Sequence, residues 1–200
     1  MKASIYLIRH GQTLWSVSGQ QTGRTDLDLT LEGQKEAKTL IARLKEIYFT
    51  HIFCSPLKRA METCRLAGLF DHAILDQRLR EWDYGRYEGL TKQEIRTQNP
   101  HWNIFSDGAL GGESVQDIKN RADEFLDSIS NLEGNIALFS HGHFLRALAA
   151  RFLKLPVENG KLFYLSTASI SILGYEQQNP IMRLWNQGMA CHLSEYQKLQ

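Results

Sequence analysis

The sequence predicts an α/β fold of three layers (α/β/α), in which a mostly parallel central sheet carries helices on both faces. Two observations predict it. Strand-like and helix-like segments alternate along most of the chain, and such alternation is typical of parallel strands joined by crossover helices. The last two strand-like segments are separated by Gln178-Asn179-Pro180, which predicts an antiparallel hairpin that adds edge strands to the sheet.

The first half of the chain is expected to hold two helices between short strands. Thr30 is a typical N-cap for a helix that runs to about Tyr48, and Ser55 and Pro56 suit the N-cap and first position of the next helix. Apolar residues at helical spacing predict the buried face of the first helix; they are Ala37, Leu40, Ile41 and Leu44. The expected strands span residues 4–8, 51–54 and 73–75, with a polar loop at residues 15–29.

The second half continues the alternation. Thr91-Lys92-Gln93-Glu94 matches a capping box and predicts the start of a helix. An irregular segment is expected at residues 99–112, before a long amphipathic helix at residues 113–132. The remaining expected elements are a strand at 135–140, a helix at about 143–153, and hairpin strands at 169–175 and 181–185.

Composition is that of an ordinary globular protein. The 200 residues are 42% hydrophobic, which suits a single domain over residues 1–200. The 23 basic and 22 acidic residues give a net charge of +1, which favours neither a nucleic acid nor a membrane as partner. The three cysteines have no CxxC spacing and are expected to be buried free thiols. No signal peptide or transmembrane segment is visible, so we expect a cytoplasmic protein.

Two of the expected strands are followed by a His-Gly pair. Arg9-His10-Gly11 follows the first strand, and His141-Gly142-His143 follows the fourth. Because ligands of open α/β sheets bind beyond the carboxyl ends of the strands, both histidines are expected at one rim. Arg59, at the start of the helix after the second strand, is expected there too. Guanidinium groups match phosphate oxygens, so the pattern predicts an anion site.

Glu81 is the expected proton donor of this site. It lies between the apolar residues Leu79 and Trp82, a setting that suits a general acid for a leaving group. Aromatic residues in nearby loops would either form a pocket wall that suits a sugar ring or belong to the core. They are Trp15, Trp82, Tyr84 and Trp102.

These motifs resemble the histidine phosphatase superfamily, also called the phosphoglycerate mutase-like family, over about residues 5–153. Four family motifs occur in the family's order. They are Arg9-His10-Gly11, Ser-Pro-x-x-Arg-Ala-x-x-Thr at 55–63, Leu-x-Glu at 79–81 followed by Glu88-Gly89, and Ser-His-Gly-x-x-x-Arg at 140–146. A further Gly-x-x-Asp-x-x-Leu-Thr-x-x-Gly pattern spans residues 23–33.

The resemblance implies the predicted fold and a phosphomonoesterase that uses no metal or other cofactor. His10 would take the phosphoryl group as a phosphohistidine, which water then hydrolyses. Glu81 would protonate the leaving alkoxide, while Arg9, Arg59 and His141 would hold the phosphoryl oxygens. Further contacts to a small phosphorylated substrate are expected from Ser16, Thr22, Gly23, Gly142, Trp82, Tyr84 and Lys92.

Departures from the mutase pattern favour hydrolysis. Ser16 and Thr22 stand where mutases have Asn and Ser, and Trp82 stands where they have Arg. The paired arginines that hold a second phosphate in mutases have no counterpart near Trp102, although Lys92 matches a mutase lysine. Several loop segments look most like the branch that contains fungal sedoheptulose-1,7-bisphosphatase, which indicates sugar phosphates or bisphosphates as substrates.

Several alternatives stay open. Three other functions are kept as alternatives: a phosphoglycerate mutase, a phosphoprotein phosphatase, and a phosphate-binding module without turnover. A module without turnover would be expected to lack His10 or Glu81. His143 is either a substrate contact or a polar residue at a helix start. Glu88 and Arg146 are expected to form structural ion pairs.

Overall fold

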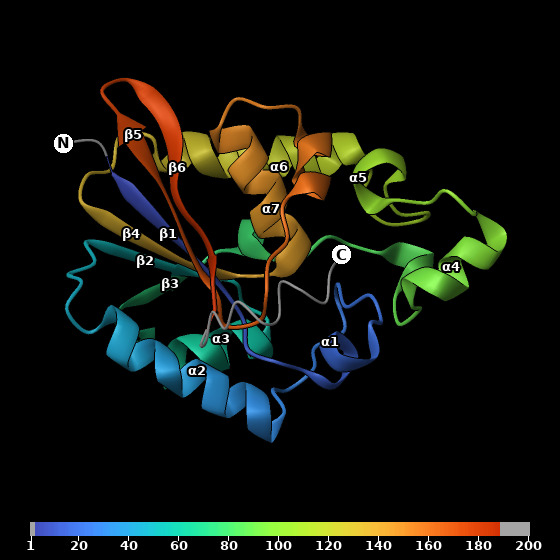
Figure 1. Cartoon of the computed structure of the whole chain (residues 1–200), viewed down its shortest axis with the longest axis horizontal. Coiled ribbons are helices and arrows are strands. Elements are labelled where there is room, and N and C mark those ends of the chain that lie inside the picture. Colours follow the sequence, from blue (N-terminus) through green and yellow to red (C-terminus); the bar gives the residue numbers. More distant parts are fainter. Residues whose placement is uncertain (1–2, 189–200) are drawn as a thin grey trace, which may run out of the picture.

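The computed structural model describes residues 3–188, and Cys191 lies outside them. A six-stranded sheet has the order β3-β2-β4-β1-β5-β6. The first four strands are parallel and the last two are antiparallel, so the predicted three-layer fold with an edge hairpin is confirmed (Figure 1). The strands are β1 (Ser4–Arg9), β2 (His51–Cys54), β3 (Ala73–Leu75), β4 (Asn135–Ser140), β5 (Ile170–Glu176) and β6 (Asn179–Gln187).

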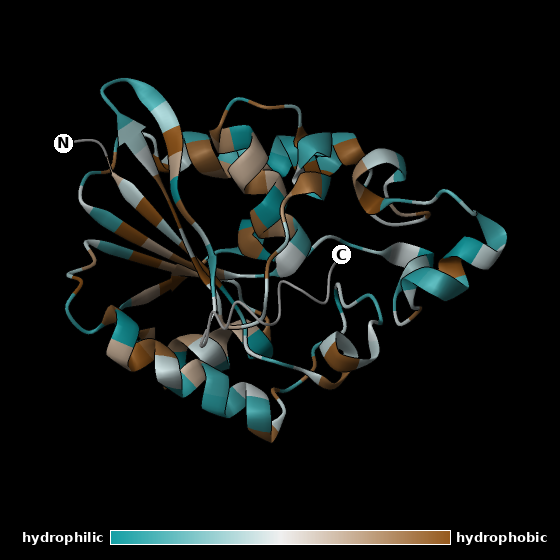
Figure 2. Ribbon diagram, in the orientation of Figure 1, coloured by the Kyte–Doolittle hydropathy of each residue, from teal (hydrophilic) through white to brown (hydrophobic). Residues whose placement is uncertain are grey.

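Helices cover both faces of the sheet. One face carries α2 (Leu31–Leu44) and α3 (Lys58–Leu66), and the other carries α6 (Val115–Ile129) and α7 (Gly142–Phe152) (Figure 1). Because successive strand residues point to opposite faces, β4 supplies two cores: Ile136 and Leu138 pack with α6 and α7, while Ala137 and Phe139 pack with α2 and α3. Hydrophobic residues therefore recur along the strands between the helix layers (Figure 2).

The first long helix is shorter than predicted. α2 begins after Thr30, whose hydroxyl accepts a hydrogen bond from Gly33 N, but it ends at Leu44 and not at Tyr48. Ala37, Leu40 and Leu44 are buried, whereas Ile41 is 48% exposed. The predicted burial of Ile41 is wrong because each residue turns 100° around the helix, which places this position at the edge of the apolar stripe.

Ser55 is not the N-cap that the sequence predicted. α3 begins at Lys58 with Leu57 as N-cap, and its first amide, Lys58 N, donates to Asp26 Oδ1 at 2.7 Å. The Ser55 hydroxyl is engaged elsewhere, since it lies 2.8 Å from Nε2 of His141. Arg59 nevertheless lies in the first turn of α3, as predicted.

The remaining elements differ from the predictions mainly at loops. The capping box of α4 (Lys92–Gln98) is present. The two segments expected to be irregular contain short helices, α1 (Leu14–Ser18) and α5 (Ile104–Asp107). The hairpin turn lies at residues 177–178, so Asn179 and Pro180 belong to the edge strand β6, where a proline is tolerated. Short 3-10 helices span Phe70–His72, Gln77–Leu79, Gly85–Tyr87 and Val157–Leu162.

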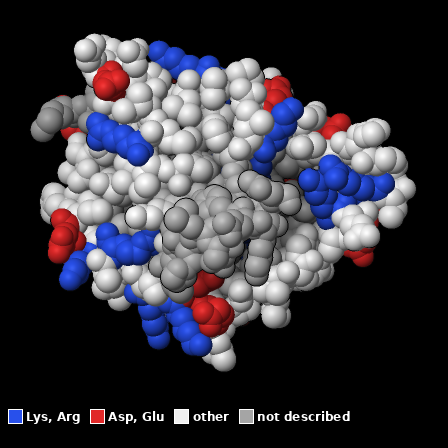
Figure 3. Space-filling model, in the orientation of Figure 1, with Lys and Arg blue, Asp and Glu red and all other residues white. Residues whose placement is uncertain are grey.

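None of the helices formed by residues 3–188 is long and apolar enough to cross a membrane. Basic and acidic side chains are interspersed on the face shown in Figure 3.

Candidate active site

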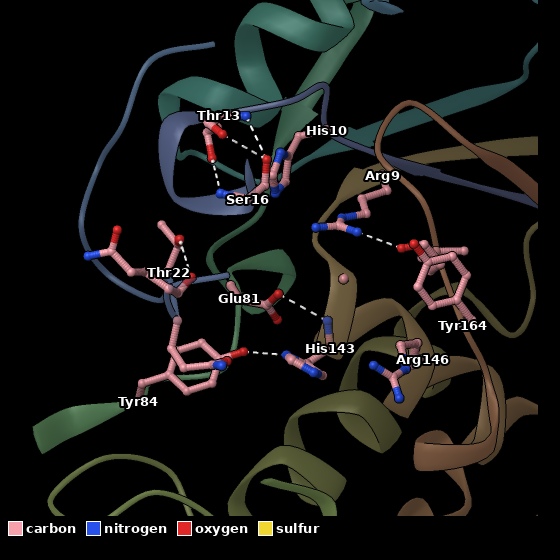
Figure 4. Close-up of a pocket in the computed structure, with 14 residues that line it drawn as sticks. Arg9, His10, Thr13, Ser16, Thr22, Glu81, Tyr84, His143, Arg146 and Tyr164 are labelled. Carbon is pink, nitrogen blue, oxygen red and sulfur yellow. Dashed lines mark hydrogen bonds between the residues drawn. The ribbon is translucent and has the colours of Figure 1, made fainter. Parts of the chain in front are cut away.

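A pocket of about 150 Å³ lies beyond the carboxyl ends of β1 and β4. Arg9 and His10 enter it at the end of β1, and Gly142 and His143 enter it at the start of α7 (Figure 4). Glu81, Ser16, Thr22 and Tyr84 line it as well. The structure therefore brings together most of the predicted site residues at the predicted rim of the sheet.

His10 is held as a neutral imidazole with one free lone pair. The residue is 5% exposed, and its Nδ1 lies 2.7 Å from Gly11 O. A carbonyl oxygen can only accept, so Nδ1 carries the proton and Nε2 carries the lone pair. Burial lowers the pKa of His10 well below its ordinary value, and the charges of Arg59 and Arg9 lower it further. An unprotonated Nε2 is the state that a nucleophile requires.

The turn after His10 depends on a close backbone approach. Gly11 N donates to Thr63 Oγ1 at 3.0 Å, and a Cβ at Gly11 would lie 2.4 Å from Gly33 O. A side chain at Gly11 would therefore push the turn away from α2 and displace His10.

Arg9 brings an unsatisfied donor to the site. Its Nη1 donates to Leu165 O at 2.5 Å, but its Nε is buried and has no hydrogen-bond partner among the described residues. Gly142 makes room for this guanidinium, because a Cβ there would lie 3.3 Å from Arg9 Nε. A buried N–H without a partner is costly, and an anion in the pocket would stabilise this arginine.

Arg59 and His141 lie beside His10 but are fully buried and do not line the pocket. The rings of His10 and His141 are 5.2 Å apart. Arg59 also donates to the carbonyl oxygens of Thr22, Gly23 and Thr25, so it anchors the loop that carries Thr22. Burial, reinforced by the Arg59 charge, lowers the pKa of His141 well below its ordinary value.

Glu81 is fixed by the first turn of α7. His141 provides no side-chain cap to this helix. Instead, Glu81 Oε2 accepts from His143 N at 3.0 Å, and Oε1 accepts from Phe144 N at 2.8 Å and from Trp82 N at 2.9 Å. The positive end of the helix holds the carboxylate, and this arrangement places it in the pocket wall next to the histidines.

His143 lies in the pocket and pairs with Tyr84, which was predicted to contact the substrate. Its Nδ1 is hydrogen-bonded to Tyr84 Oη, and both side chains line the pocket. Burial raises the pKa of Tyr84 and lowers the pKa of His143, so both groups are neutral near pH 7. Of the two interpretations of His143, the pocket position favours substrate contact.

Three predicted substrate contacts lie outside the pocket lining. Trp82 is fully buried, donates through Nε1 to Glu113 O at 2.8 Å and packs on Phe105, so it belongs to the core. Gly23 is buried behind the wall and donates to Glu88. Lys92 is exposed on α4. Their chain positions near the motifs did not reveal which way each residue faces.

Trp102 and Glu88 also have structural roles. Trp102 is 2% exposed and donates to Gly108 O at 3.0 Å, which makes it a core residue and not a pocket wall. Glu88 was expected in an ion pair, but its carboxylate accepts from the backbone amides of Gly23 and Thr25. It therefore shapes the loop under the pocket.

Sequence reasoning missed several residues of the site. Tyr164 and Leu165 precede β5 and line the pocket, but no sequence pattern marks them. Arg146 was expected in a structural ion pair, yet it lines the pocket, and among residues 3–188 no carboxylate lies within 4.0 Å of its nitrogens. Its place in the motif at 140–146 was the available signal. No group of three potential metal ligands occurs within residues 3–188.

Comparison with known proteins identifies the class to which this fold and site belong. The sequence pattern of the histidine phosphatase superfamily (branch 1) matches residues 5–188, and the chain belongs to this family. It is thus a histidine phosphatase, an enzyme that hydrolyses phosphate monoesters.

Three relatives illustrate the similarity. An acid phosphatase of Mycobacterium tuberculosis is 40% identical over 176 residues, or 86% of each chain. Sedoheptulose 1,7-bisphosphatase of Saccharomyces cerevisiae is 37% identical over 76% of this chain and 68% of that protein. The solved structure of an open reading frame from Mycobacterium tuberculosis has a TM-score of 0.90, with 35% identity over 94% of this chain and 99% of the other.

Proposed function

We propose that this protein hydrolyses phosphomonoesters of small metabolites through a phosphohistidine at His10, with no metal ion. The observation that carries the proposal is the state of His10. Its Nδ1–H is bound to Gly11 O, so Nε2 keeps its lone pair, and burial lowers the pKa of the imidazole.

The first step transfers the phosphoryl group to the enzyme. His10 Nε2 forms a bond to phosphorus as the bond from phosphorus to the ester oxygen breaks. The leaving oxygen takes a proton that Glu81, which lines the pocket beside it, has first accepted from the monoanionic phosphate group of the substrate. Arg9, with its unsatisfied Nε, and the positive charge of Arg59 balance the charge on the phosphoryl oxygens, the role that a metal ion has in other phosphatases. His141 holds Arg59 and the His10 ring in place.

In the second step water attacks phosphorus, the bond between phosphorus and Nε2 breaks, and inorganic phosphate leaves. Glu81, now deprotonated, takes the proton from the water. Polar side chains at the pocket support hydrolysis over transfer to a second substrate, because they keep water close to the phosphohistidine. They are Ser16, Gln20 and Gln21.

The substrate class follows from size and surroundings. A pocket of about 150 Å³ fits a small ester, and the relatives include a sugar bisphosphatase by name, which supports sugar phosphates as candidates. The buried free thiols Cys54 and Cys64 are consistent with a reducing compartment, so we place the protein in the cytoplasm.

A substrate panel tests this function. Inorganic phosphate is measured after incubation with sugar phosphates, glycerol 3-phosphate and phosphoamino acids, in excess EDTA. We expect release from the small phosphate esters in wild type and in Lys38→Met, an exposed control on α2, but not in His10→Ala. Activity that needs an added divalent ion would contradict the metal-independent mechanism.

A further inference from the structure

Arg146 is an unexplained cation in the pocket wall. It projects from α7 and lines the same pocket as His10 and Glu81. In Figure 4, His10 and Arg146 lie on opposite sides of the pocket, and Glu81 lies between them. The phosphohistidine mechanism uses the His10 side and leaves Arg146 without a task.

Two neighbours fix the orientation of this guanidinium. Nε donates to Gly160 O at 2.9 Å in the 3-10 helix at Val157–Leu162, and Cζ lies 4.7 Å from the centre of the Phe105 ring. One edge and one face of the planar group are thus occupied. Among the described residues, no hydrogen bond engages Nη1 or Nη2 and no carboxylate pairs with Arg146, so the outer edge remains for a ligand.

The cations of the site form two groups. The charges that lower the pKa of His10 are those of Arg59 and Arg9. Those that lower the pKa of His143 are the charges of Arg146, Arg9 and Lys92. Arg9 is common to both groups, whereas Arg59 acts at the histidine that attacks phosphorus and Arg146 acts on the side of the Tyr84–His143 pair.

Arg146 also remains charged while poorly hydrated. Burial lowers its pKa to about 10, so the guanidinium is positive at neutral pH. A partly buried charge without a paired carboxylate is unfavourable until an anion reaches it. A bidentate anion such as a carboxylate or phosphate matches the free edge of the group.

We propose that Arg146 binds a second anionic group of the substrate, a carboxylate or a second phosphate on the leaving group. The proposal rests on the phosphatase function of the same site. In-line attack by His10 places the leaving group on the far side of phosphorus, toward Glu81 and then Arg146. The preferred substrates are therefore small esters with two anionic groups, and Arg146 sets this preference.

Matched substrate pairs test the assignment. Glycerol 3-phosphate and 3-phosphoglycerate differ by one carboxylate, and fructose 6-phosphate and fructose 1,6-bisphosphate differ by one phosphate. Charge-assisted hydrogen bonds contribute about 1.5–3 kcal/mol, which corresponds to roughly a 10- to 150-fold preference in kcat/KM. Wild type should show this preference within at least one pair, and the pair that shows it identifies the second group.

Arg146→Met should bring the kcat/KM ratio within that pair close to one, and Arg146→Lys should restore part of it. Lys161→Met removes the same charge from an exposed residue next to Gly160 and should keep the wild-type ratio. A ratio of one in wild type overturns the proposal. So does a ratio that Arg146→Met leaves intact while activity on both members falls, because Arg146 would then only hold the fold together.

Binding separates this proposal from the proposed function. In a His10→Ala background, calorimetry measures the affinity for 3-phosphoglycerate, glycerol 3-phosphate and the fructose pair with and without Arg146→Met. Loss of the preference for the doubly anionic ligand supports the subsite, even if wild type hydrolyses none of these esters. If the singly and doubly anionic ligands bind with equal affinity both in His10→Ala and in the double variant with Arg146→Met, the subsite is refuted, even if the phosphatase function holds.

Discussion

Arg59 Nε lies 3.1 Å from His141 Nδ1 and donates a hydrogen bond to it. Since a guanidinium can only donate, Nδ1 of His141 is unprotonated and the ring proton sits on Nε2. That nitrogen donates in turn to Ser55 Oγ at 2.8 Å. The chain from Arg59 through His141 to Ser55 therefore fixes both the orientation and the tautomer of a buried imidazole beside His10.

The first prediction concerns Ser55, the last residue in this series of hydrogen bonds. Ser55→Ala would leave the His141 Nε2–H without its acceptor in a fully buried position, at a cost of about 1–3 kcal/mol in the free energy of unfolding. Urea denaturation measures the loss. Ser130→Ala removes an exposed hydroxyl whose partner is Asp127 O and should change stability by less than about 0.5 kcal/mol. Equal values for the two variants would argue against the hydrogen bond from His141 to Ser55.

The opposite tautomers of His10 and His141 give a second prediction. Nitrogen-15 NMR of the rings should find the proton on Nδ1 in His10 and on Nε2 in His141. Because burial lowers both pKa values well below the ordinary histidine range, both rings should stay neutral as the pH falls from 7.5 to 6. A His10 ring that takes up a proton above pH 6.5 would contradict the structure of the site.

The lowered pKa of His10 also sets the pH dependence of the reaction. The nucleophile is lost when His10 becomes protonated, so activity should fall only as the pH passes below the lowered pKa of His10. The acid limb of kcat/KM, which reports the free enzyme, should therefore lie below pH 6.5, the midpoint of an ordinary histidine. The profile is recorded at p-nitrophenyl phosphate concentrations far below KM. An acid limb centred near pH 7 would show that another group controls the rate.

Glu81 should matter most when the leaving group needs a proton. Glu81→Gln is expected to slow single turnovers of alkyl phosphates by about 10²–10⁴-fold, and those of p-nitrophenyl phosphate far less. The amide must turn an NH₂ group toward a backbone N–H, because both carboxylate oxygens accept such bonds. Thermal melting therefore accompanies the kinetics, and the ratio between the two substrates cancels any unfolded fraction. Equal losses of rate on both substrates would show that Glu81 only caps α7 and does not protonate the leaving group.

Phosphatase and mutase activities are separated by following two products in one reaction. With 3-phosphoglycerate, we expect release of inorganic phosphate to exceed formation of 2-phosphoglycerate. A mutase must keep water away from a long-lived phosphohistidine, whereas Ser16, Gln20 and Gln21 make this pocket polar. Isomerisation faster than phosphate release, with and without added 2,3-bisphosphoglycerate, would make the chain a mutase.

The sequence predicted what depends on local order and missed what depends on distant partners. His10 and the His141-Gly142 pair were found because strand ends in a parallel sheet share one rim. The role of Ser55 was missed because its hydroxyl bonds a residue 86 positions away, and local patterns favoured an N-cap. Trp82 and Tyr84 stand two positions apart in one loop, yet Trp82 is core and Tyr84 lines the pocket; only tertiary packing decides between them.

The covalent intermediate tests the central claim most directly. Wild type is mixed rapidly with p-nitrophenyl phosphate, denatured at alkaline pH to preserve a bond between phosphorus and nitrogen, and digested for mass spectrometry. The proposed mechanism predicts a phosphoryl group on His10 that is released by acid, and no phosphorylated peptide in His10→Ala. Steady phosphate release without a phosphoryl group on His10, or turnover that survives in His10→Ala, would contradict the mechanism.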